Sequence, residues 1–147
     1  MIKHINLFKA IWISFIAGFL STLVFHQGFL EALFQLHLIT KKPFSMAATF
    51  PFGIPACFSL AFWGGVWSIA GLLILKSYLS EKKFYLFFIL FGGIFPPLVA
   101  MLVVFPLKGI SMVSFMNTVS LSMMFLINAL WGYGSALFIK VILRLSN

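Results

Sequence analysis

Long apolar runs separated by short polar segments set the hydrophobic pattern of this chain. Four of the runs reach the length of ~20 residues that a helix needs to cross a hydrocarbon core about 30 Å thick. They predict membrane-spanning helices over residues 7–25, 56–75, 84–105 and 121–143. The expected fold class is all-α: residues 1–147 form a single polytopic membrane domain of four transmembrane helices, arranged as two hairpins.

Prolines mark the segment where the helical pattern stops after the first run. Residues 28–39 predict a helical tail that extends the first helix or lies in the membrane interface. Residues 40–55 contain three prolines, and because proline has no N–H to donate, we expect an irregular loop there. The loop has no charge after Lys42, so it should pack on the protein or dip toward the membrane. The pattern does not decide whether the loop is re-entrant.

The third apolar run carries its own interruptions. Gly92-Gly93 and Pro96-Pro97 lie in its middle, and the proline pair removes backbone hydrogen bonds. We therefore expect a kink in this helix.

Charge is scarce, and its scarcity indicates a membrane protein. Only 12 of the 147 residues are charged, ten Lys or Arg and two Asp or Glu, while 63% are hydrophobic. A soluble domain of this size cannot bury so much apolar surface. The formal net charge of +8 would suit nucleic acid, but the basic residues stand singly or in pairs at the ends of apolar runs. That placement is typical of anchoring, so we expect no nucleic acid as a partner.

The basic residues also predict an orientation. Seven of them fall on the side of the two termini and three on the opposite side. Because cytoplasmic segments are enriched in Lys and Arg, we expect both termini in the cytoplasm and the loop 40–55 on the outer face. The seven are Lys3, Lys9, Lys76, Lys82, Lys83, Lys140 and Arg144, and the three are Lys41, Lys42 and Lys108.

Polar side chains beside the apolar runs each need a reason to be there. His26 ends the first predicted helix; a local hydrogen-bonding or capping role is favoured, and metal binding, haem ligation or proton relay are the alternatives. His37 follows 11 residues later, about 16 Å along a helix, so we expect no two-histidine metal site. For Glu31, a plain interfacial position is favoured over proton coupling.

Other residues predict packing inside the bundle. Asn128 lies near mid-depth, and its amide should face the bundle. Trp63 and Trp131 lie deeper than an interfacial belt, and each is followed by glycine, so each ring is expected to fill space against a neighbouring backbone. The pairs Trp63-Gly64 and Trp131-Gly132 also indicate an internal repeat, with chance similarity as the alternative.

The sequence contains no nucleophile–base pair, phosphate-binding loop, metal cluster or carboxylate pair. With two acids the chain has little to offer acid–base catalysis. Cys57 is the single cysteine, which excludes an intramolecular disulfide and a structural zinc site within one copy. We expect no catalytic residues, no metal and no cofactor. A membrane enzyme or redox subunit is the least favoured class, and a haem absorption band would revive it through His26.

Six short strings together resemble a family of small, uncharacterised, four-span inner-membrane proteins of proteobacteria. The strings are Phe25-His26-Gln27-Gly28, Pro43-Phe44-Ser45-Met46, Pro51-Phe52-Gly53-Ile54-Pro55, Phe62-Trp63-Gly64-Gly65, Val104-Phe105-Pro106-Leu107-Lys108-Gly109 and Asn128-Ala129-Leu130-Trp131-Gly132. The resemblance covers most of the chain. It implies a bacterial inner-membrane location and a topology, but no mechanism, because the family has no assigned activity.

Five of these six strings lie toward the outer half or the mid-membrane zone of the expected topology. We hypothesise a site there, capped by residues 43–55, with Lys108 as a fixed positive charge suited to an anionic lipid headgroup or an acidic partner loop. The candidate site residues are His26, Gln27, Glu31, Pro51, Gly53 and Lys108; the candidate packing residues are Asn128, Trp63, Trp131 and Gly132.

The function we expect is that of a non-enzymatic membrane protein that binds lipid or a partner complex as an accessory subunit. The alternative is a small transporter or channel subunit that acts as an oligomer. The expected partners are membrane lipid and, as alternatives, a membrane protein complex or a second copy. A water-filled polar passage would favour transport, and a closed, aromatic-packed centre would favour the accessory protein.

Overall fold

The computed structural model describes residues 6–75, 80–111 and 117–145. Within these ranges it contains four helices that are long and apolar enough to cross a membrane. They span Leu7–Gln35, Ala56–Ile74, Glu81–Leu107 and Thr118–Leu145. The prediction of an all-α chain with four helices of membrane-spanning length is confirmed.

The first helix is longer than the apolar run alone indicates. The α-helix α1 (Leu7–Ser21), the π-helical segment η2 (Thr22–Gln27) and α2 (Gly28–Gln35) follow one another without a break. The Asn6 side chain begins α1 by accepting a hydrogen bond from the Phe8 N–H at 3.0 Å. At 1.5 Å per residue the continuous helix is about 43 Å long, more than a ~30 Å hydrocarbon core requires. The tail at residues 28–35 therefore extends the first helix.

The third helix passes through its proline pair. It comprises α4 (Glu81–Val99), the π-helical segment η3 (Ala100–Val104) and the short α5 (Phe105–Leu107). Pro96 and Pro97 lie inside α4, and the irregularity follows them as the wider turns of η3. The chain leaves the helix at Gly109, whose φ of 66° is in the left-handed region that favours glycine.

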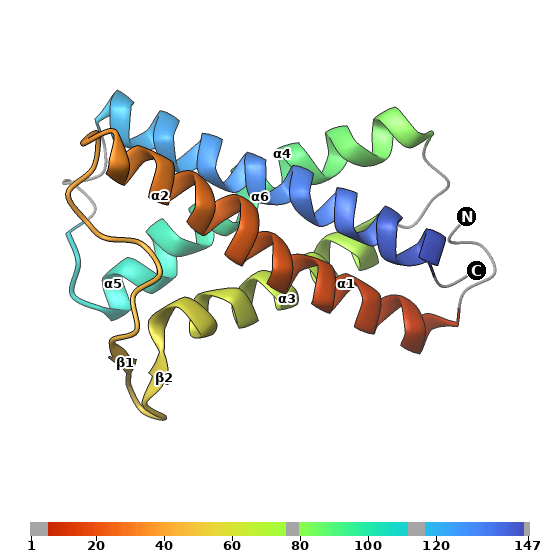
Figure 1. Ribbon diagram of the computed structural model, residues 1–147, viewed down its shortest axis with the longest axis horizontal. Coiled ribbons are helices and arrows are strands. Elements are labelled where there is room, and N and C mark those ends of the chain that lie inside the picture. Colours follow the sequence, from red (N-terminus) through yellow and green to blue (C-terminus); the bar gives the residue numbers. More distant parts are fainter. Residues whose placement is uncertain (1–5, 76–79, 112–116, 146–147) are drawn as a thin grey trace.

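The four long helices pack in a definite order. Figure 1 shows α1 crossing the middle of the molecule beside α3 (Ala56–Ile74) and α6 (Thr118–Leu145), while α4 crosses α6 and packs against it. α1 and α6 are therefore the central helices, and α3 and α4 flank them. We call the end where α1 begins and α6 ends the terminal end; the opposite end, with α2, α5 and the start of α6, is the loop end (Figure 1).

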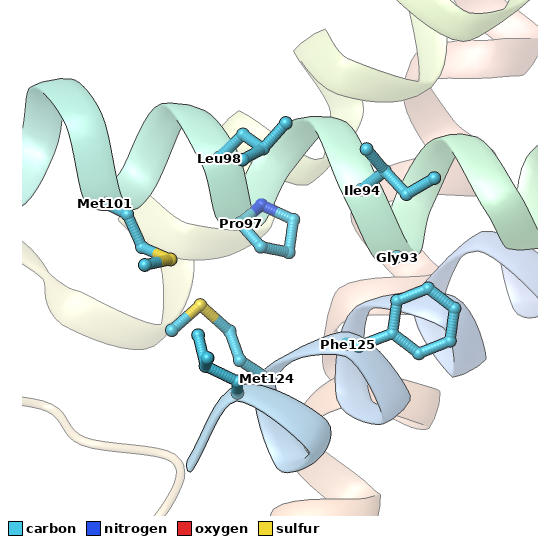
Figure 2. A pocket seen from close by; sticks show the side chains of 8 residues that line it. Gly93, Ile94, Pro97, Leu98, Met101, Met124 and Phe125 are labelled. Atoms are coloured by element: carbon cyan, nitrogen blue, oxygen red, sulfur yellow. The ribbon is translucent and has the colours of Figure 1, made fainter. Parts of the chain in front are cut away.

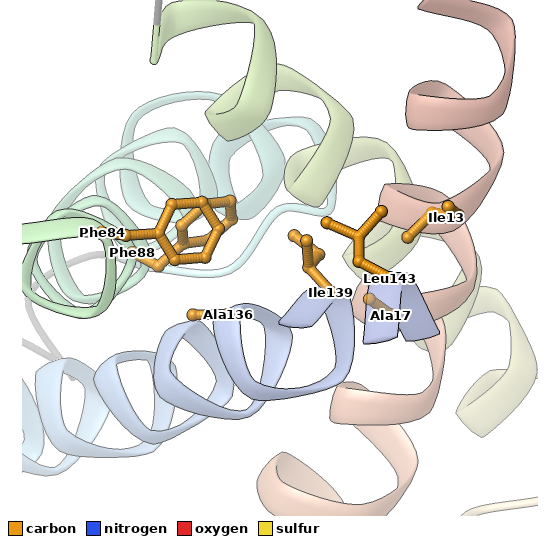
Figure 3. Close-up of a cluster of buried hydrophobic side chains, with 7 residues drawn as sticks. All are labelled: Ile13, Ala17, Phe84, Phe88, Ala136, Ile139 and Leu143. Atoms are coloured by element: carbon orange, nitrogen blue, oxygen red, sulfur yellow. The ribbon is translucent and has the colours of Figure 1, made fainter. Parts of the chain in front are cut away.

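Small residues set the close approaches between these helices. Gly18 of α1 lies against Gly64 and Ser68 of α3, and Gly132 of α6 lies against the Phe88 carbonyl of α4. Small side chains let membrane helices pack backbone to backbone. Between these contacts, toward the terminal end, a cluster of buried apolar side chains fills the bundle (Figure 3). Its members are Ile13, Ala17, Phe84, Phe88, Ala136, Ile139 and Leu143.

The proline-rich loop contains regular structure that the sequence did not predict. The two-residue strands β1 (Ala48–Thr49) and β2 (Ile54–Pro55) pair antiparallel, with Ala48 opposite Pro55 and Thr49 opposite Ile54. Gly53 closes the turn with a φ of 68°, which a residue with a Cβ rarely adopts. Earlier in the loop Pro43 is buried, whereas the turn of the hairpin is exposed.

Candidate functional site at the loop end

A buried amide ties the loop to the first helix. Gln27, at the end of η2, is only 5% exposed. Its Oε1 accepts a hydrogen bond from the Phe44 backbone N–H at 2.8 Å. Phe44 has a φ of 51°, an uncommon conformation for a bulky residue, and this hydrogen bond holds it there. Gln27 therefore fixes the course of the chain between α2 and the β-hairpin.

His26 takes part in the same junction. Its Nδ1 lies 3.3 Å from Gln27 Nε2, within hydrogen-bonding distance. His26 and Gln27 therefore form one polar pair at the end of η2. In the part of the chain that the structure describes, His, Cys, Asp and Glu residues form no group of three that could hold a metal ion.

The remaining candidate site residues lie at the same end but outside this junction. Glu31 accepts a hydrogen bond from Gln35 Nε2 at 2.6 Å, one turn further along α2. Pro51 and Gly53 lie in the exposed turn of the β-hairpin, and Lys108 is exposed just after α5. The structure thus brings His26 and Gln27 together with Phe44, and places the other four elsewhere on the loop end.

The charged side chains have different surroundings at the two ends of the bundle. At the terminal end Glu81 lies 3.7 Å from both the Lys140 ammonium and the Arg144 guanidinium. Lys140 also lies over the Phe84 ring, 5.3 Å from its centroid. At the loop end Lys41, Lys42 and Lys108 are all exposed. Over residues 6–75, 80–111 and 117–145, neither of the ion pairs involves these three lysines, so the loop end retains its positive charge.

An apolar groove lies between α4 and α6, in the half of the bundle nearer the loop end. Figure 2 shows side chains from both helices bordering an open space, whose volume is about 220 Å³. The residues that line it are Gly93, Ile94, Pro97, Leu98, Met101, Leu121, Met124 and Phe125. All are apolar, and the two methionines are flexible enough to follow an irregular hydrocarbon chain. The glycine and proline pairs were visible in the sequence, but nothing there indicated that α6 leaves a gap beside them.

The middle of the bundle is closed by Trp131. The residue is 3% exposed, and its Nε1 donates a hydrogen bond to the Gly18 carbonyl at 3.1 Å. The Ser21 hydroxyl donates to the Trp131 carbonyl at 2.6 Å. Added Cβ atoms on Gly64 and Gly92 would lie 3.1 and 3.0 Å from the Trp131 ring system, so this side chain touches α1, α3 and α4.

The other candidate packing residues have different surroundings. Gly132 packs against α4, as described above. Asn128 satisfies its amide along its own helix, since Nδ2 donates to the Met124 carbonyl at 2.9 Å. Trp63 lies on the surface of α3, with 56% of the residue exposed. Trp131 and Gly132 therefore form the centre, whereas Trp63 faces away from the other helices.

No family model, no curated protein and no solved structure matches this chain. The chemistry of the site therefore rests on its own geometry. Among the described residues, the loop end has three exposed lysines outside the two ion pairs, and the apolar groove lies in the same half of the bundle.

Proposed function

We propose that this chain is a non-enzymatic multi-pass protein of a bacterial inner membrane that binds an anionic phospholipid at its loop end. In this proposal α1–α3 and α4–α6 are two hairpins, the termini are cytoplasmic and the loop end faces outward. The orientation follows from the excess of Lys and Arg on the terminal side, seven against three. The accessory role follows from the absence of any chemistry of its own in the site described above.

The observation that carries the proposal is the relation between the α4–α6 groove and Lys108. The groove borders on Met101, and Lys108 follows seven residues later, about 10 Å along the helix axis. An acyl chain in the groove would have its phosphate near the membrane surface, where the Lys108 ammonium is exposed. Lysine binds phosphate as a point charge, without the fixed geometry that arginine requires.

The closed centre also supports a binding protein over a transporter. A passage for polar solutes would be lined by polar atoms that rely on water. In the described residues, every buried side-chain nitrogen and oxygen has a hydrogen-bond partner within the protein. Trp131 and Phe88 fill the space between the helices. The alternative, a transporter or channel subunit, would need a passage between copies.

The test is the lipid that stays bound through purification. Lys108→Gln should lower the amount of anionic phospholipid per protein in mild detergent, as measured by mass spectrometry. Lys83→Gln is the matched control, because it removes the same charge from an exposed residue of the terminal end. Equal lipid content in the two variants and the parent would contradict the proposal. Loss of a co-purifying protein from Lys108→Gln, with lipid unchanged, would instead favour a partner complex.

A second pair of variants tests the groove. Leu98→Trp places a large ring in the groove and should displace the acyl chain, so bound phospholipid should fall. Leu90→Trp is the control, because Leu90 is exposed on the same helix and does not line the groove. If both variants retain the lipid of the parent, the groove does not hold it.

A further inference from the structure

We infer that the turn of the β-hairpin, residues 49–54, is a membrane anchor that inserts Phe50 and Phe52 into the lipid interface beside α3. The partner is the bilayer itself, at the leaflet of the loop end. This inference does not rest on the phospholipid site, because insertion of aromatic rings requires no negative headgroup. The two can therefore fail separately.

The exposure of the two rings is the first observation. Phe50 is 98% exposed and Phe52 is 84% exposed. Burial of apolar surface away from water is favourable in proportion to its area, so two large exposed rings forgo that free energy as long as they stay in water. Both are on one short turn, together with Pro51, so the turn presents a compact apolar surface that the rest of the described chain leaves uncovered.

The direction of the hairpin places this surface at the bilayer. β2 ends at Pro55, and α3 begins at the next residue, so the hairpin lies where α3 enters the membrane. In Figure 1 the hairpin projects sideways from the start of α3, across the long axis of the bundle rather than beyond its end. A hairpin at this level that points away from the helices meets lipid headgroups and the first part of the acyl chains.

The composition and the hydrogen bonding of the hairpin also suit a lipid environment. Residues 43–75 contain no Asp, Glu, Lys or Arg. The Gly53 N–H donates to the Thr49 carbonyl at 2.8 Å, and the Thr49 hydroxyl donates to the Ile54 carbonyl at 2.8 Å. Pro51 and Pro55 have no N–H to satisfy. Backbone groups that are paired or absent lower the cost of leaving water.

Hydrogen bonds to α3 hold the hairpin in this direction. The Ala56 N–H donates to the Ala47 carbonyl at 2.9 Å, and the Cys57 N–H donates to the Ser45 carbonyl at 3.0 Å. These N–H groups belong to the first turn of α3, where a helix has no partners of its own. The base of the hairpin therefore caps α3, and the position of the turn follows that of the helix.

The absence of charge favours lipid over a protein partner as the occupant. A docking surface for a soluble protein commonly has a polar rim that gives specificity. Here the nearest charged residue before the turn is Lys42, and the nearest after it is Lys76 at the other end of α3. A bilayer needs no such rim, since interfacial binding depends on the apolar area inserted.

Site-directed spin labelling in lipid nanodiscs of phosphatidylcholine tests the anchor. In a full-length Cys57→Ser background, Phe50→Cys and Phe52→Cys receive a nitroxide. We expect both labels to collide more with oxygen, which concentrates in lipid, than with a water-soluble nickel chelate. Lys42→Cys is the control, because Lys42 is an exposed loop residue before the hairpin, and its label should show the reverse preference.

Two results would overturn the inference. Labels at positions 50 and 52 that prefer the nickel chelate, as at position 42, would show that the turn stands in water. Labels shielded from both reagents would show that protein covers it, as in contact with a second copy. Hydroxyl-radical footprinting of the unmodified chain in the same nanodiscs provides a check without substitutions: Phe50 and Phe52 should be oxidised less than in detergent-free denatured chain, and less than Leu38, which is also exposed.

Discussion

The pair Trp-Gly occurs in the middle of both α3 and α6, yet its two copies have opposite surroundings. The glycines behave alike: Gly64 lies against α1, and Gly132 lies against α4. The tryptophans do not, because Trp131 is buried while Trp63 faces outward. A residue just before a helical glycine points about 100° away from it around the helix. On the central helix α6 the tryptophan therefore points at α1, where it contacts Gly18. On the flanking helix α3 the tryptophan points out of the bundle.

This comparison shows what the repeat in the sequence can and cannot specify. Glycine determines where two helices approach closely, and one neighbouring helix suffices for that. The burial of the tryptophan depends on whether a second helix lies in the direction of its own side chain, as it does for Trp131 and not for Trp63. The similarity between α3 and α6 is therefore confined to one face of each helix.

The largest expected effect comes from truncating the tryptophans. Trp131→Ala should lower the free energy of unfolding by about 3 kcal/mol or more, because it opens a cavity between α1, α3 and α4 and removes the hydrogen bond to Gly18. Trp63→Ala should change it by less than about 0.5 kcal/mol. Thermal unfolding of both variants in the same detergent measures the difference. Similar destabilisation by the two would mean that Trp63 also has a second neighbour.

The glycines should respond more equally than the tryptophans. Gly132→Ala would drive a methyl group into the Phe88 carbonyl, and a backbone atom cannot move aside cheaply. We expect a loss of about 2–3 kcal/mol. Gly64→Ala would meet the Thr22 hydroxyl, which must give up its hydrogen bond to the Gly18 carbonyl to move aside, and the added methyl group would lie 3.0 Å from that carbonyl oxygen. Because the closest contact is a side chain, a smaller loss of about 1 kcal/mol is expected. A Gly64→Ala, Thr22→Ala double variant should recover part of that loss; no recovery would place the clash in the backbone instead.

The residue one turn after each glycine distinguishes the two interfaces further. Ser68 follows Gly64 by four residues and shares its hydroxyl with Ser14 at 2.9 Å, whereas Ala136 follows Gly132 at the same spacing. Ser68→Ala should cost about 0.6–1 kcal/mol, the usual value of a side-chain hydrogen bond between membrane helices. A double-mutant cycle with Ser14→Ala measures the coupling. Additive losses would show that the pair contributes no interaction of its own.

The smallest effect is expected at the terminal end, where only α6 has an ion pair with its neighbour in the described residues. Glu81→Gln removes the contacts with Lys140 and Arg144, and because Glu81 is exposed the expected loss is about 0.5 kcal/mol or less. Raising the salt concentration should reduce the difference between variant and parent. A loss that is large and independent of salt would show that Glu81 holds α4 to α6 by more than charge.

The sequence was sufficient to locate the four helices, because an apolar run of membrane length has few alternatives to a helix. The Trp-Gly pairs were visible as a repeat, and in the structure Trp131 and Gly132 lie at helix contacts. The sequence could not assign Trp63 to the surface, since the residues around it resemble those around Trp131. Only the order of the helices in space distinguishes the two.

The loop end was the least predictable region. The hydrogen bond from Phe44 to Gln27 joins residues 17 positions apart through a turn with an uncommon backbone conformation. The β-hairpin has strands of two residues, too short for an alternating pattern to be visible. The α4–α6 groove arises from the relative course of two helices. None of these features produces a periodic pattern of hydrophobic residues in the sequence. The sequence shows only that prolines and glycines interrupt the helical pattern in these regions.

The π-helical segment η2 also determines the direction in which the first helix presents Gln27. Wider turns of this kind are equivalent to one extra residue inserted into an α-helix. Such a turn absorbs the extra residue locally, so the helical segments before and after it keep the relative orientation of an uninterrupted α-helix. α1 therefore keeps its contacts with α3 and α6 while Gln27 accepts the Phe44 N–H. If residues 22–27 adopted ordinary turns with no residue removed, Gln27 would rotate by about 100° about the helix axis and leave Phe44.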